Sequence, residues 1–485
     1  MLRVSDTVSP PADSARTADL FTPERRGLTI GLVATITLVA MESLAIGTVM
    51  PTVAGELGDL GLYGWVYSAF FLGSLIGIVV SGGLLDRWPL HRPFAAGLTL
   101  FALGLALGGA AQSMPMLVVA RFIQGLGGGA VPPTAYVAIG RLLPDRLQPK
   151  MFAIMSAAWV APGIIGPSLA ALVGGLLGWR WVFLGLIPFL VVAGGFALSA
   201  LYRLPGDRPA AAGAAPRATA LRRLGVALLA AAGAGIVVAA LDMADLLPLA
   251  LGLAVGLALL LPAYRWLTPP GTLRLARGVP AAVFLRGMMT FSFFIGDAYI
   301  ALLLQTWRER PLALTGVVFT ITTLAWSVGT WIQSRRIDRL GPSLFIVTGF
   351  AGIAVGSLLT AAAALPFVPP EVTIVTWTIT GVGMGLMYSA VTLVVLRGAG
   401  PGEQGSASSA LQLSDILGTA LGTGVGGAII AAGERSGASG LGPALGAVFI
   451  VSVVVGLAGM AVAGRVRRPG TDGIGARRTA AAAVD

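Results

Sequence analysis

Long apolar stretches with almost no charged residues recur along the sequence from Gly27 nearly to the C-terminus. About 20 consecutive apolar residues are enough for a helix to cross the hydrocarbon core of a bilayer. Inside that core, only structures that satisfy their own backbone hydrogen bonds persist. Hydrophobic residues make up 56% of the chain and charged residues only 11%, whereas about 25% are charged in a soluble domain. The sequence therefore predicts an all-α integral membrane protein.

We expect fourteen spanning helices. Their predicted ranges are 27–50, 62–85, 94–112, 115–140, 151–176, 180–203, 223–241, 246–264, 280–305, 313–334, 343–365, 371–396, 405–432 and 441–464. The seventh and eighth are short and are joined by Asp242-Met243-Ala244-Asp245. A count of twelve would leave this pair outside the bilayer, and its uncharged Ala, Leu and Val composition argues against that.

The net charge of +11 could indicate a nucleic-acid partner, but the positions of the basic residues favour another interpretation. If the connections alternate between the two sides, 26 of the 32 basic residues lie on the side of the N-terminus and 4 on the other side. The remaining two, Arg121 and Arg286, fall inside spans. Cytoplasmic connections of membrane proteins carry this excess of Lys and Arg. Both termini are therefore expected in the cytoplasm, with no nucleic-acid partner and with the chain in the cell membrane.

The chain is expected to divide at its polar segments. The predicted parts are a cytoplasmic tail at 1–26, a six-helix bundle at 27–203, a cytoplasmic linker at 204–222, an accessory helix pair at 223–264, a second six-helix bundle at 280–464 and a cytoplasmic tail at 465–485. The first 24 or so residues are polar, carry charges of both signs and are predicted to be disordered. The run after Arg25-Arg26 is too long for the core of a signal peptide, so it is expected to remain as the first helix.

Three landmarks recur in the same order in both halves of the chain. They are an intramembrane carboxylate, an Asp-Arg pair at a turn, and three alternate glycines. In the first half they are Glu42, Asp86-Arg87 and Gly125/Gly127/Gly129. In the second half they are Asp297, Asp338-Arg339 and Gly381/Gly383/Gly385. The carboxylate precedes the Asp-Arg pair by 44 residues in the first half and by 41 in the second. Transporters are often built from such repeats. Two six-helix bundles facing each other are the natural interpretation.

Four motifs make the sequence resemble the major facilitator superfamily, in particular its fourteen-span drug:proton antiporter branch. They are the loop Gly82–Arg92 with its second copy Asp338-Arg339-Leu340-Gly341, the fourth-span run Arg121–Ala130, the fifth-span run Pro162-Gly163-Ile164-Ile165-Gly166-Pro167, and Met41-Glu42 through Met50-Pro51 in the first span. The resemblance covers 27–465. It implies the major-facilitator fold, two six-helix bundles plus two extra central helices, and it implies that Glu42 and Arg121 take part in proton coupling.

Ionisable side chains at membrane depth are costly unless they are paired or face water, so each is a candidate functional residue. Glu42 and Arg121 are both expected in the outer third of the membrane, where they can meet across the bundle. In the functional interpretation Glu42 takes up a proton beside Arg121. In the alternative, the two form a static ion pair that only fixes helix packing.

Three further charges are expected inside spans. Asp297 occupies the depth equivalent to Glu42, and its partner helix offers Trp377 in place of Arg121, so Asp297 either is protonated or awaits a cationic substrate; it could also simply be hydrated near the outer surface. Asp415 lies near mid-membrane beside Gln412, either as a proton-coupling residue or in a helix–helix hydrogen bond. Arg286 is expected to extend to the cytoplasmic surface.

Other candidates concern substrate binding and gating. Residues proposed to contact the substrate are Gln124, Trp159, Trp326, Trp377 and Gln412, although such aromatic residues more often only pack. The pairs Asp86-Arg87 and Asp338-Arg339 are interpreted as latches that hold the bundles together in the outward-facing state. Gly166-Pro167 is expected to loosen the fifth span, because proline removes a backbone hydrogen bond; an ordinary kink is the alternative.

The predicted function is proton-coupled export of small lipophilic or cationic compounds by a monomeric transporter in contact with membrane lipids. An exporter of lipids or metabolites and a non-transporting receptor remain alternatives. The chain has no cysteine and no phosphate-binding G-x-x-x-x-G-K-[ST] run, so neither a Cys-based metal site, nor another cofactor, nor nucleotide-driven or enzymatic chemistry is expected. The energy source would be an ion gradient.

Overall fold

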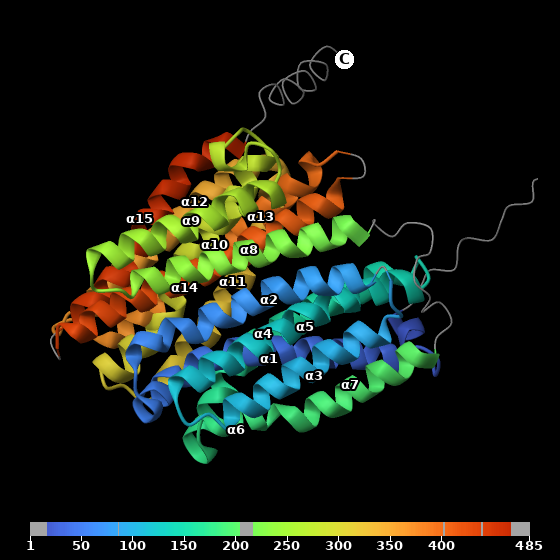
Figure 1. Ribbon diagram of the computed structural model, residues 1–485, viewed down its shortest axis with the longest axis horizontal. Coiled ribbons are helices and arrows are strands. Elements are labelled where there is room, and N and C mark those ends of the chain that lie inside the picture. Colours follow the sequence, from blue (N-terminus) through green and yellow to red (C-terminus); the bar gives the residue numbers. More distant parts are fainter. Residues whose placement is uncertain (1–16, 86, 204–216, 401–402, 438–439, 467–485) are drawn as a thin grey trace, which may run out of the picture.

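A computed structural model of the protein describes residues 17–85, 87–203, 217–400, 403–437 and 440–466. Within these ranges the secondary structure consists of helices. Fourteen of the described helical segments are long and apolar enough to cross a membrane, which confirms the predicted all-α membrane protein with fourteen spans. Figure 1 shows them running roughly along one common direction, as the spanning requirement demands.

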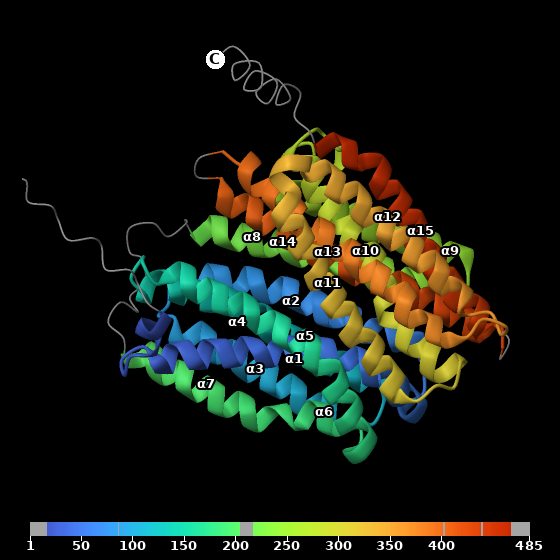
Figure 2. The ribbon, with the colours of Figure 1, turned by 180° about the vertical axis from the view of Figure 1, so that it is seen from behind.

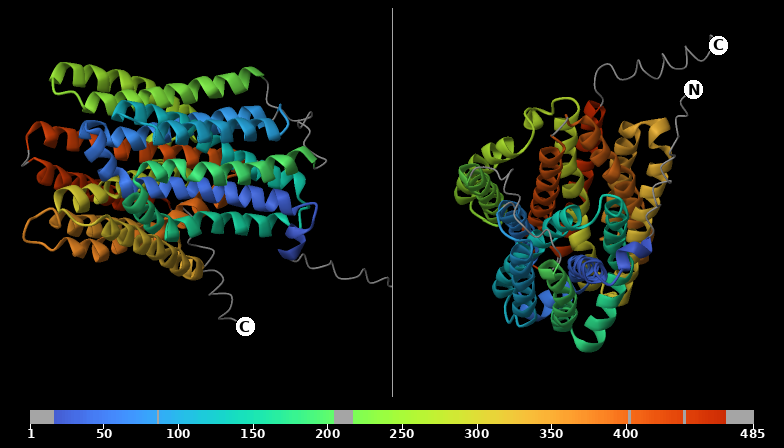
Figure 3. Two further views of the ribbon diagram at one scale, coloured as in Figure 1. Left: turned by 90° about the horizontal axis from the view of Figure 1, so that it is seen from below. Right: turned by 90° about the vertical axis from the view of Figure 1, so that its right-hand side faces the viewer.

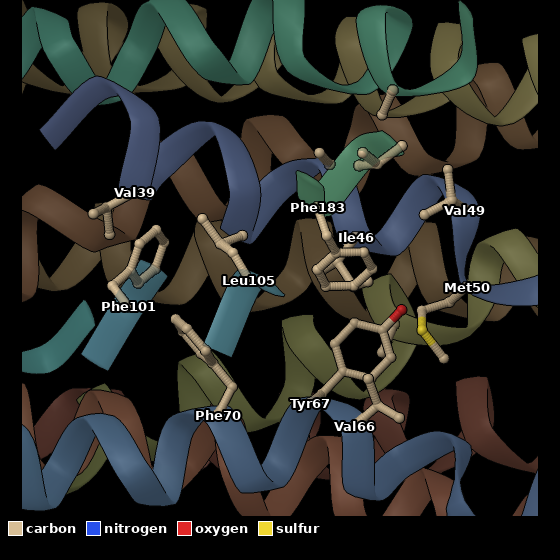
Figure 4. Packing of buried hydrophobic residues seen from close by; sticks show 14 of the residues in the cluster. Val39, Ile46, Val49, Met50, Val66, Tyr67, Phe70, Phe101, Leu105 and Phe183 are labelled. Atoms are coloured by element: carbon tan, nitrogen blue, oxygen red, sulfur yellow. The ribbon is translucent and has the colours of Figure 1, made fainter. Parts of the chain in front are cut away.

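The first six spans form the N-terminal bundle. They are α1 (Arg26–Leu57), α2 (Tyr63–Leu85), α3 (His91–Gly109), α4 (Met114–Leu142), α5 (Gln148–Leu177) and a sixth span made of α6 (Arg180–Leu184) and α7 (Leu186–Arg203). Its core is drawn in Figure 4, where the labelled side chains come from α1, α2, α3 and α6: Val39, Ile46, Val49, Met50, Val66, Tyr67, Phe70, Phe101, Leu105 and Phe183.

The last six spans form the C-terminal bundle. They are α10 (Val279–Leu302), α11 (Leu312–Leu340), α12 (Pro342–Ala362), α13 (Thr373–Gly398), α14 (Gln404–Arg435) and α15 (Leu441–Ala463). The span of α10 continues through one π-helical segment, η4 (Leu303–Trp307). Short 3-10 turns lie at η2 (Leu60–Leu62), η3 (Thr272–Arg274), η5 (Pro370–Val372) and η6 (Gly464–Val466).

Two boundary predictions differ from the structure. The tail that was expected to be disordered ends in a 3-10 helix, η1 (Thr17–Phe21), whose Leu20 is fully buried. Thr29 Oγ1 donates to the Leu20 carbonyl at 2.8 Å, so η1 is held against the start of α1. The predicted linker at 204–222 ends earlier, because α8 begins at Arg217. The other predicted residues of both tails and of the linker, 1–16, 204–216 and 467–485, lie outside the described ranges.

The repeated glycines hold neighbouring helices at close range. A Cβ added to Gly125 of α4 would lie 2.1 Å from the Phe70 carbonyl oxygen of α2, and one added to Gly385 of α13 would lie 2.1 Å from the Trp326 carbonyl oxygen of α11. Only glycine allows two backbones to approach this closely. The repeat noted in the sequence is therefore a repeated helix contact, α2 on α4 and α11 on α13.

The two bundles touch mainly in one half of their length. We call the end that carries Arg92, Lys150, Arg222, Arg274 and Arg336 the arginine-rich end. Hydrogen bonds between the bundles lie in the half away from it: Ser68 Oγ to the Ala420 carbonyl (2.8 Å), Thr320 Oγ1 to the Ile164 carbonyl (3.1 Å) and Gln305 Nε2 to the Thr48 carbonyl (2.8 Å). Towards the arginine-rich end the ribbons of the bundles diverge (Figure 2).

The accessory pair, α8 (Arg217–Leu241) and α9 (Leu246–Leu267), is central in the sequence but lies at the edge of the molecule (Figure 3). α8 packs on α2 of one bundle and α14 of the other. The loop between α8 and α9 is held by both bundles, because Trp65 Nε1 donates to Asp242 Oδ2 at 3.0 Å and Arg435 Nη1 donates to the Asp242 carbonyl at 3.2 Å. Burial raises the pKa of the Asp242 carboxyl, and the Trp65 hydrogen bond opposes that rise.

The glycine contact yields the first prediction. Gly125→Ala should destabilise the protein, because the added methyl group collides with a backbone carbonyl and α4 must move away from α2; overpacking of this kind costs about 1–3 kcal/mol. Gly140→Ala is the matched control on the same helix, since nothing lies within 4 Å of its Cβ position. Thermal unfolding of the purified variants in detergent measures both. Equal unfolding temperatures for the two variants would contradict the close-contact account.

Candidate functional site

The centre of the N-terminal bundle holds a buried ion pair. Glu42 of α1 is 1% exposed and Arg121 of α4 is 2% exposed. Arg121 Nη1 donates to Glu42 Oε1 and, at 2.7 Å, to Gln124 Oε1, while Nε donates to the Val66 carbonyl at 3.2 Å. The guanidinium carbon also lies 4.3 Å from the Phe70 ring centroid. The structure thus brings Glu42 and Arg121 together, and it places Gln124 in the same network.

This network is not fully satisfied. In the part of the chain that the structure describes, Glu42 Oε2 and Gln124 Nε2 are buried and form no hydrogen bond, and the same holds for the hydroxyls of Tyr63 and Tyr67 on the neighbouring α2. A buried polar atom left unpaired costs about 1–3 kcal/mol, so such atoms usually mark a place for water or a functional group. Glu42 therefore keeps one oxygen that can accept a proton or a water molecule while the other stays bonded to Arg121.

The equivalent position in the C-terminal bundle has a different partner. Trp377 Nε1 of α13 donates to Asp297 Oδ1 of α10 at 3.1 Å, and Trp377 is fully buried. Trp377 lies four residues before Gly381, as Arg121 lies four residues before Gly125. Asp297 is therefore bonded by a neutral donor where Glu42 is bonded by a cation.

A second ion pair lies nearer the arginine-rich end. Arg286 of α10 binds both oxygens of Asp415 of α14, at 3.0 and 3.1 Å. The guanidinium carbon lies 3.4 Å from the Tyr388 ring centroid, and Tyr388 OH donates to Asp415 Oδ2 at 3.2 Å. The expectation that Arg286 extends to the membrane surface is wrong, because a carboxylate and an aromatic face within reach bind it inside the bundle, where its side chain is 6% exposed.

Aromatic side chains surround this second pair. Trp326 of α11 lies 5.4 Å from Tyr388 and 5.5 Å from Phe293, measured between ring centroids. In the other bundle Trp159 of α5 and Tyr136 of α4 are 40% and 38% exposed, and the Tyr136 ring centroid lies 6.0 Å from that of Phe152.

One face of α14 shows which way this region opens. Thr419 is 3% exposed, the Asp415 side chain is 26% exposed, and Gln412 is exposed. These residues follow one another at helical spacing toward the arginine-rich end. Exposure therefore increases toward that end. Of the predicted substrate residues, Trp159, Trp326 and Gln412 are accessible in whole or in part, whereas Gln124 and Trp377 are bonded within the buried pairs.

The predicted latches are only partly within the described ranges. Asp86 lies outside them. Asp338 lies in the last turn of α11, and its carboxylate is 3.5 Å from Arg397 Nη1 of α13, within its own bundle, with both side chains largely exposed. Arg339 is exposed on the same turn, and Arg87 follows α2 at the same end. The Asp338–Arg397 pair therefore does not join the bundles, as expected where they diverge.

Gly166 and Pro167 lie at the contact between the bundles. α5 stays helical through both residues. The next residue, Ser168, shares a 2.9 Å hydrogen bond with Thr320 of α11, and Thr320 also donates to the Ile164 carbonyl. The Gly-Pro segment therefore lies in the half where the bundles are joined. A change in the conformation of α5 there would alter the hydrogen bonds between α5 and α11 directly.

Sequence reasoning missed several of these residues. Tyr63 and Tyr67, with their unpaired hydroxyls, and Tyr388 are the main omissions. A usable signal existed, since a phenol inside an apolar span needs a partner for its hydroxyl. The accessory pair's attachment through Asp242 left no comparable signal, because its partners Trp65 and Arg435 are distant in sequence.

The family profile described as Major Facilitator Superfamily matches residues 32–332. The chain belongs to the major facilitator superfamily. The family membership that the sequence motifs implied is thus confirmed, and the fourteen apolar helices agree with a multi-pass membrane protein. Solved members share the fold: the nucleoside transporter NupG superposes with a TM-score of 0.64 at 14% identity, covering 90% of this chain and 99% of that one, and a D-xylose–proton symporter with 0.61 at 14%, covering 90% and 97%.

Several relatives carry names that refer to drugs. Multidrug resistance protein 3 of Bacillus subtilis is 33% identical over 33% of this chain and 31% of its own length, and a multidrug transporter protein of the same organism is 31% identical over 35% and 31%. Each of these two matches thus spans under a third of the relative. A protein of Mycobacterium tuberculosis named as a probable multidrug-efflux transporter is 25% identical over 86% of this chain and 90% of its own length.

The buried pair yields the second prediction. Arg121→Gln should lower the free energy of unfolding by about 3–5 kcal/mol, because it leaves the Glu42 carboxylate buried without a cation. The double variant Glu42→Gln/Arg121→Gln should recover much of that loss. Arg180→Gln is the control in the same bundle: its pair with Glu56 is 37% and 50% exposed, so the loss should be about 1 kcal/mol or less. Thermal or denaturant unfolding gives the comparison, and equal losses for the two single variants would contradict it.

Proposed function

We propose that the protein is a proton-coupled antiporter that exports small lipophilic or cationic compounds by alternating access. The observation that carries the proposal is Glu42, a carboxylate buried inside the membrane span that has one oxygen bonded to Arg121 and one oxygen with no hydrogen-bond partner among the described residues. A buried carboxylate held in this way can change its charge without leaving its bundle. That is the requirement for a group that couples proton binding to movement of the bundle.

The arrangement of the bundles supports alternating access. The buried charge pairs Glu42–Arg121 and Asp415–Arg286 each lie within one bundle. The bundles are held to each other by hydrogen bonds such as that of Ser68 and by contacts of small residues such as Gly64, whose Cβ position lies 2.7 Å from the Thr423 carbonyl. Contacts of this kind can separate without exposing a buried charge, so the joined end can open while each bundle stays intact.

The two carboxylates on equivalent helices would have different roles. Protonation of Glu42 removes its charge attraction to Arg121 and leaves a buried cation, which favours rearrangement around α4. Asp297 accepts a hydrogen bond from the Trp377 N–H and has no ion-pair partner among the described residues, so it is suited to hold either a proton or the positive charge of a substrate. Asp415 stays paired with Arg286 and would join the proton coupling only when that pair opens.

Several observations support the substrate class. Aromatic side chains that are at least partly exposed occur in both bundles, Trp159 and Tyr136 in one and Trp326 and Tyr388 in the other, and such side chains suit flat lipophilic compounds and cations. The drug-related names of the relatives agree with this class. Substrate contact by Gln124 and Trp377 would require a conformation in which their buried hydrogen bonds open.

Orientation and energy source complete the proposal. By the positive-inside rule the arginine-rich end faces the cytoplasm, so the described conformation would be the inward-facing one, in the cell membrane with both termini inside. Each charge that moves across the membrane potential contributes about 2.3 kcal/mol per 100 mV.

The site is formed within one chain, so a monomer would suffice for transport. The latch role of Asp86, Arg87, Asp338 and Arg339, and the hinge role of Gly166-Pro167, belong to this proposal.

The third prediction concerns transport. In everted membrane vesicles, a pH gradient, acid inside, should drive uptake of ethidium, and Glu42→Gln should lower the gradient-dependent rate at least tenfold because residue 42 can no longer exchange a proton. Glu434→Gln is the control: this glutamate is exposed at the end of α14 opposite the arginine-rich end, and its loss should leave the rate within about twofold. A Glu42→Gln rate equal to that of Glu434→Gln would remove Glu42 from the mechanism.

The same assay separates the alternatives. Transport that does not respond to collapse of the pH gradient would rule out proton coupling. Failure to move any of a panel of lipophilic dyes, with lipid retained on purification and moved between leaflets, would replace the drug substrate by a lipid. No flux of either kind would favour a non-transporting receptor.

A further inference from the structure

The accessory pair presents a groove that the transport proposal does not use. It lies at the arginine-rich end of α9, has a volume of about 510 Å³, and is lined by Leu261, Pro262, Arg265, Trp266 and Leu273. α9 is the least buried span of the described chain, because it packs mainly on α8 and turns its other side outward. The groove is thus on a surface that meets the bilayer.

The charge around this groove is positive. Arg265 is part of its wall, and the guanidinium carbon of Arg222, on α8, lies 5.0 Å from the Trp266 ring centroid. Between residues 217 and 279 the only acidic residues are Asp242 and Asp245, and both lie at the other end of the pair. Within the described ranges neither Arg222 nor Arg265 forms an ion pair with a carboxylate. Two guanidinium groups at the groove therefore have no carboxylate partner among the described residues.

The lining has two chemical parts at two depths. Leu261 and Pro262 lie within α9 and form an apolar wall, whereas Arg265 and Trp266 lie in its last turn and Leu273 in η3 beyond it. Tryptophan is typical of the level of the lipid headgroups, and basic side chains at the end of a span attract anionic headgroups. A free anion would contact the arginines but not the apolar wall, whereas a phospholipid would contact both, with its headgroup on the arginines and an acyl chain on the wall.

We propose that this groove binds a phospholipid with an anionic headgroup, with its phosphate on Arg222 and Arg265 and one acyl chain along Leu261 and Pro262. The end of α9 that would bind the lipid is connected by a hydrogen bond to the helix that carries Asp415. Tyr264, next to Arg265, shares a 2.7 Å hydrogen bond with Ser414, and Ser414 precedes Asp415 in the pair with Arg286. A lipid that holds the end of α9 in place stabilises this contact with α14.

Native mass spectrometry of the purified protein tests the site, and the fourth prediction follows. Phosphatidylglycerol should remain bound at a concentration at least tenfold lower than phosphatidylcholine with the same acyl chains. Arg222→Gln/Arg265→Gln should abolish that preference because it removes both cations. Arg336→Gln, an exposed arginine of α11 at the same end, should keep it. Glycerol 3-phosphate, the headgroup without chains, should not compete.

Leu273→Glu provides a second variant should the double substitution prevent folding. Leu273 is 38% exposed and so tolerates a polar replacement, but a carboxylate there repels the lipid phosphate and should also abolish the preference. The proposal is overturned if the wild type shows no preference, if the Arg222/Arg265 variant or the Leu273→Glu variant keeps it, or if glycerol 3-phosphate displaces the lipid. None of these results bears on whether Glu42 couples transport to protons.

Discussion

The hydrocarbon core of a bilayer offers no partner to a charged or polar group, and this constraint governs where the charges of the protein lie. The pairs Glu42–Arg121 and Arg286–Asp415 each join two helices of one bundle, and each supplies part of the hydrogen bonding that water would otherwise give. The bundles themselves meet through hydroxyls, carbonyls and small residues such as Gly64. Separating the helices within a bundle would expose or unpair a charge, which requires much free energy. Separating the two bundles breaks only weaker contacts, so movement can occur at the boundary between them.

The two bundles share a backbone plan but differ in chemistry. The close contacts at Gly125 and Gly381 repeat the same helix pairing, and the residues four positions before these two glycines occupy equivalent places. One of these is Arg121, a permanent cation, and the other is Trp377, a neutral donor. A symmetric fold thus carries an asymmetric pair of carboxylates, and the asymmetry allows one bundle to respond to protonation differently from the other.

Much of this arrangement could be predicted from the sequence, because charges inside apolar spans are rare and depth limits which of them can meet. That logic led to the fourteen spans, the two bundles and the meeting of Glu42 with Arg121. It failed for Arg286, because depth alone does not reveal that α14 places Asp415 beside it. It also missed the packing of Leu20 on α1 and the attachment of Asp242 to Trp65, since side-by-side placement of helices is decided by tertiary packing, which leaves little trace in local composition.

The central claim is that Glu42 couples proton binding to transport. In an antiporter that works in this way, binding of a lipophilic cation should favour the form in which Glu42 has lost its proton. Proton release on addition of tetraphenylphosphonium to the detergent-solubilised protein, followed with a pH indicator in weakly buffered solution, measures this directly. The account predicts release by the wild-type protein and by Glu434→Gln, and little or no release by Glu42→Gln even where that variant still binds the cation. Cation binding without release by the wild type, or equal release by Glu42→Gln, would contradict it.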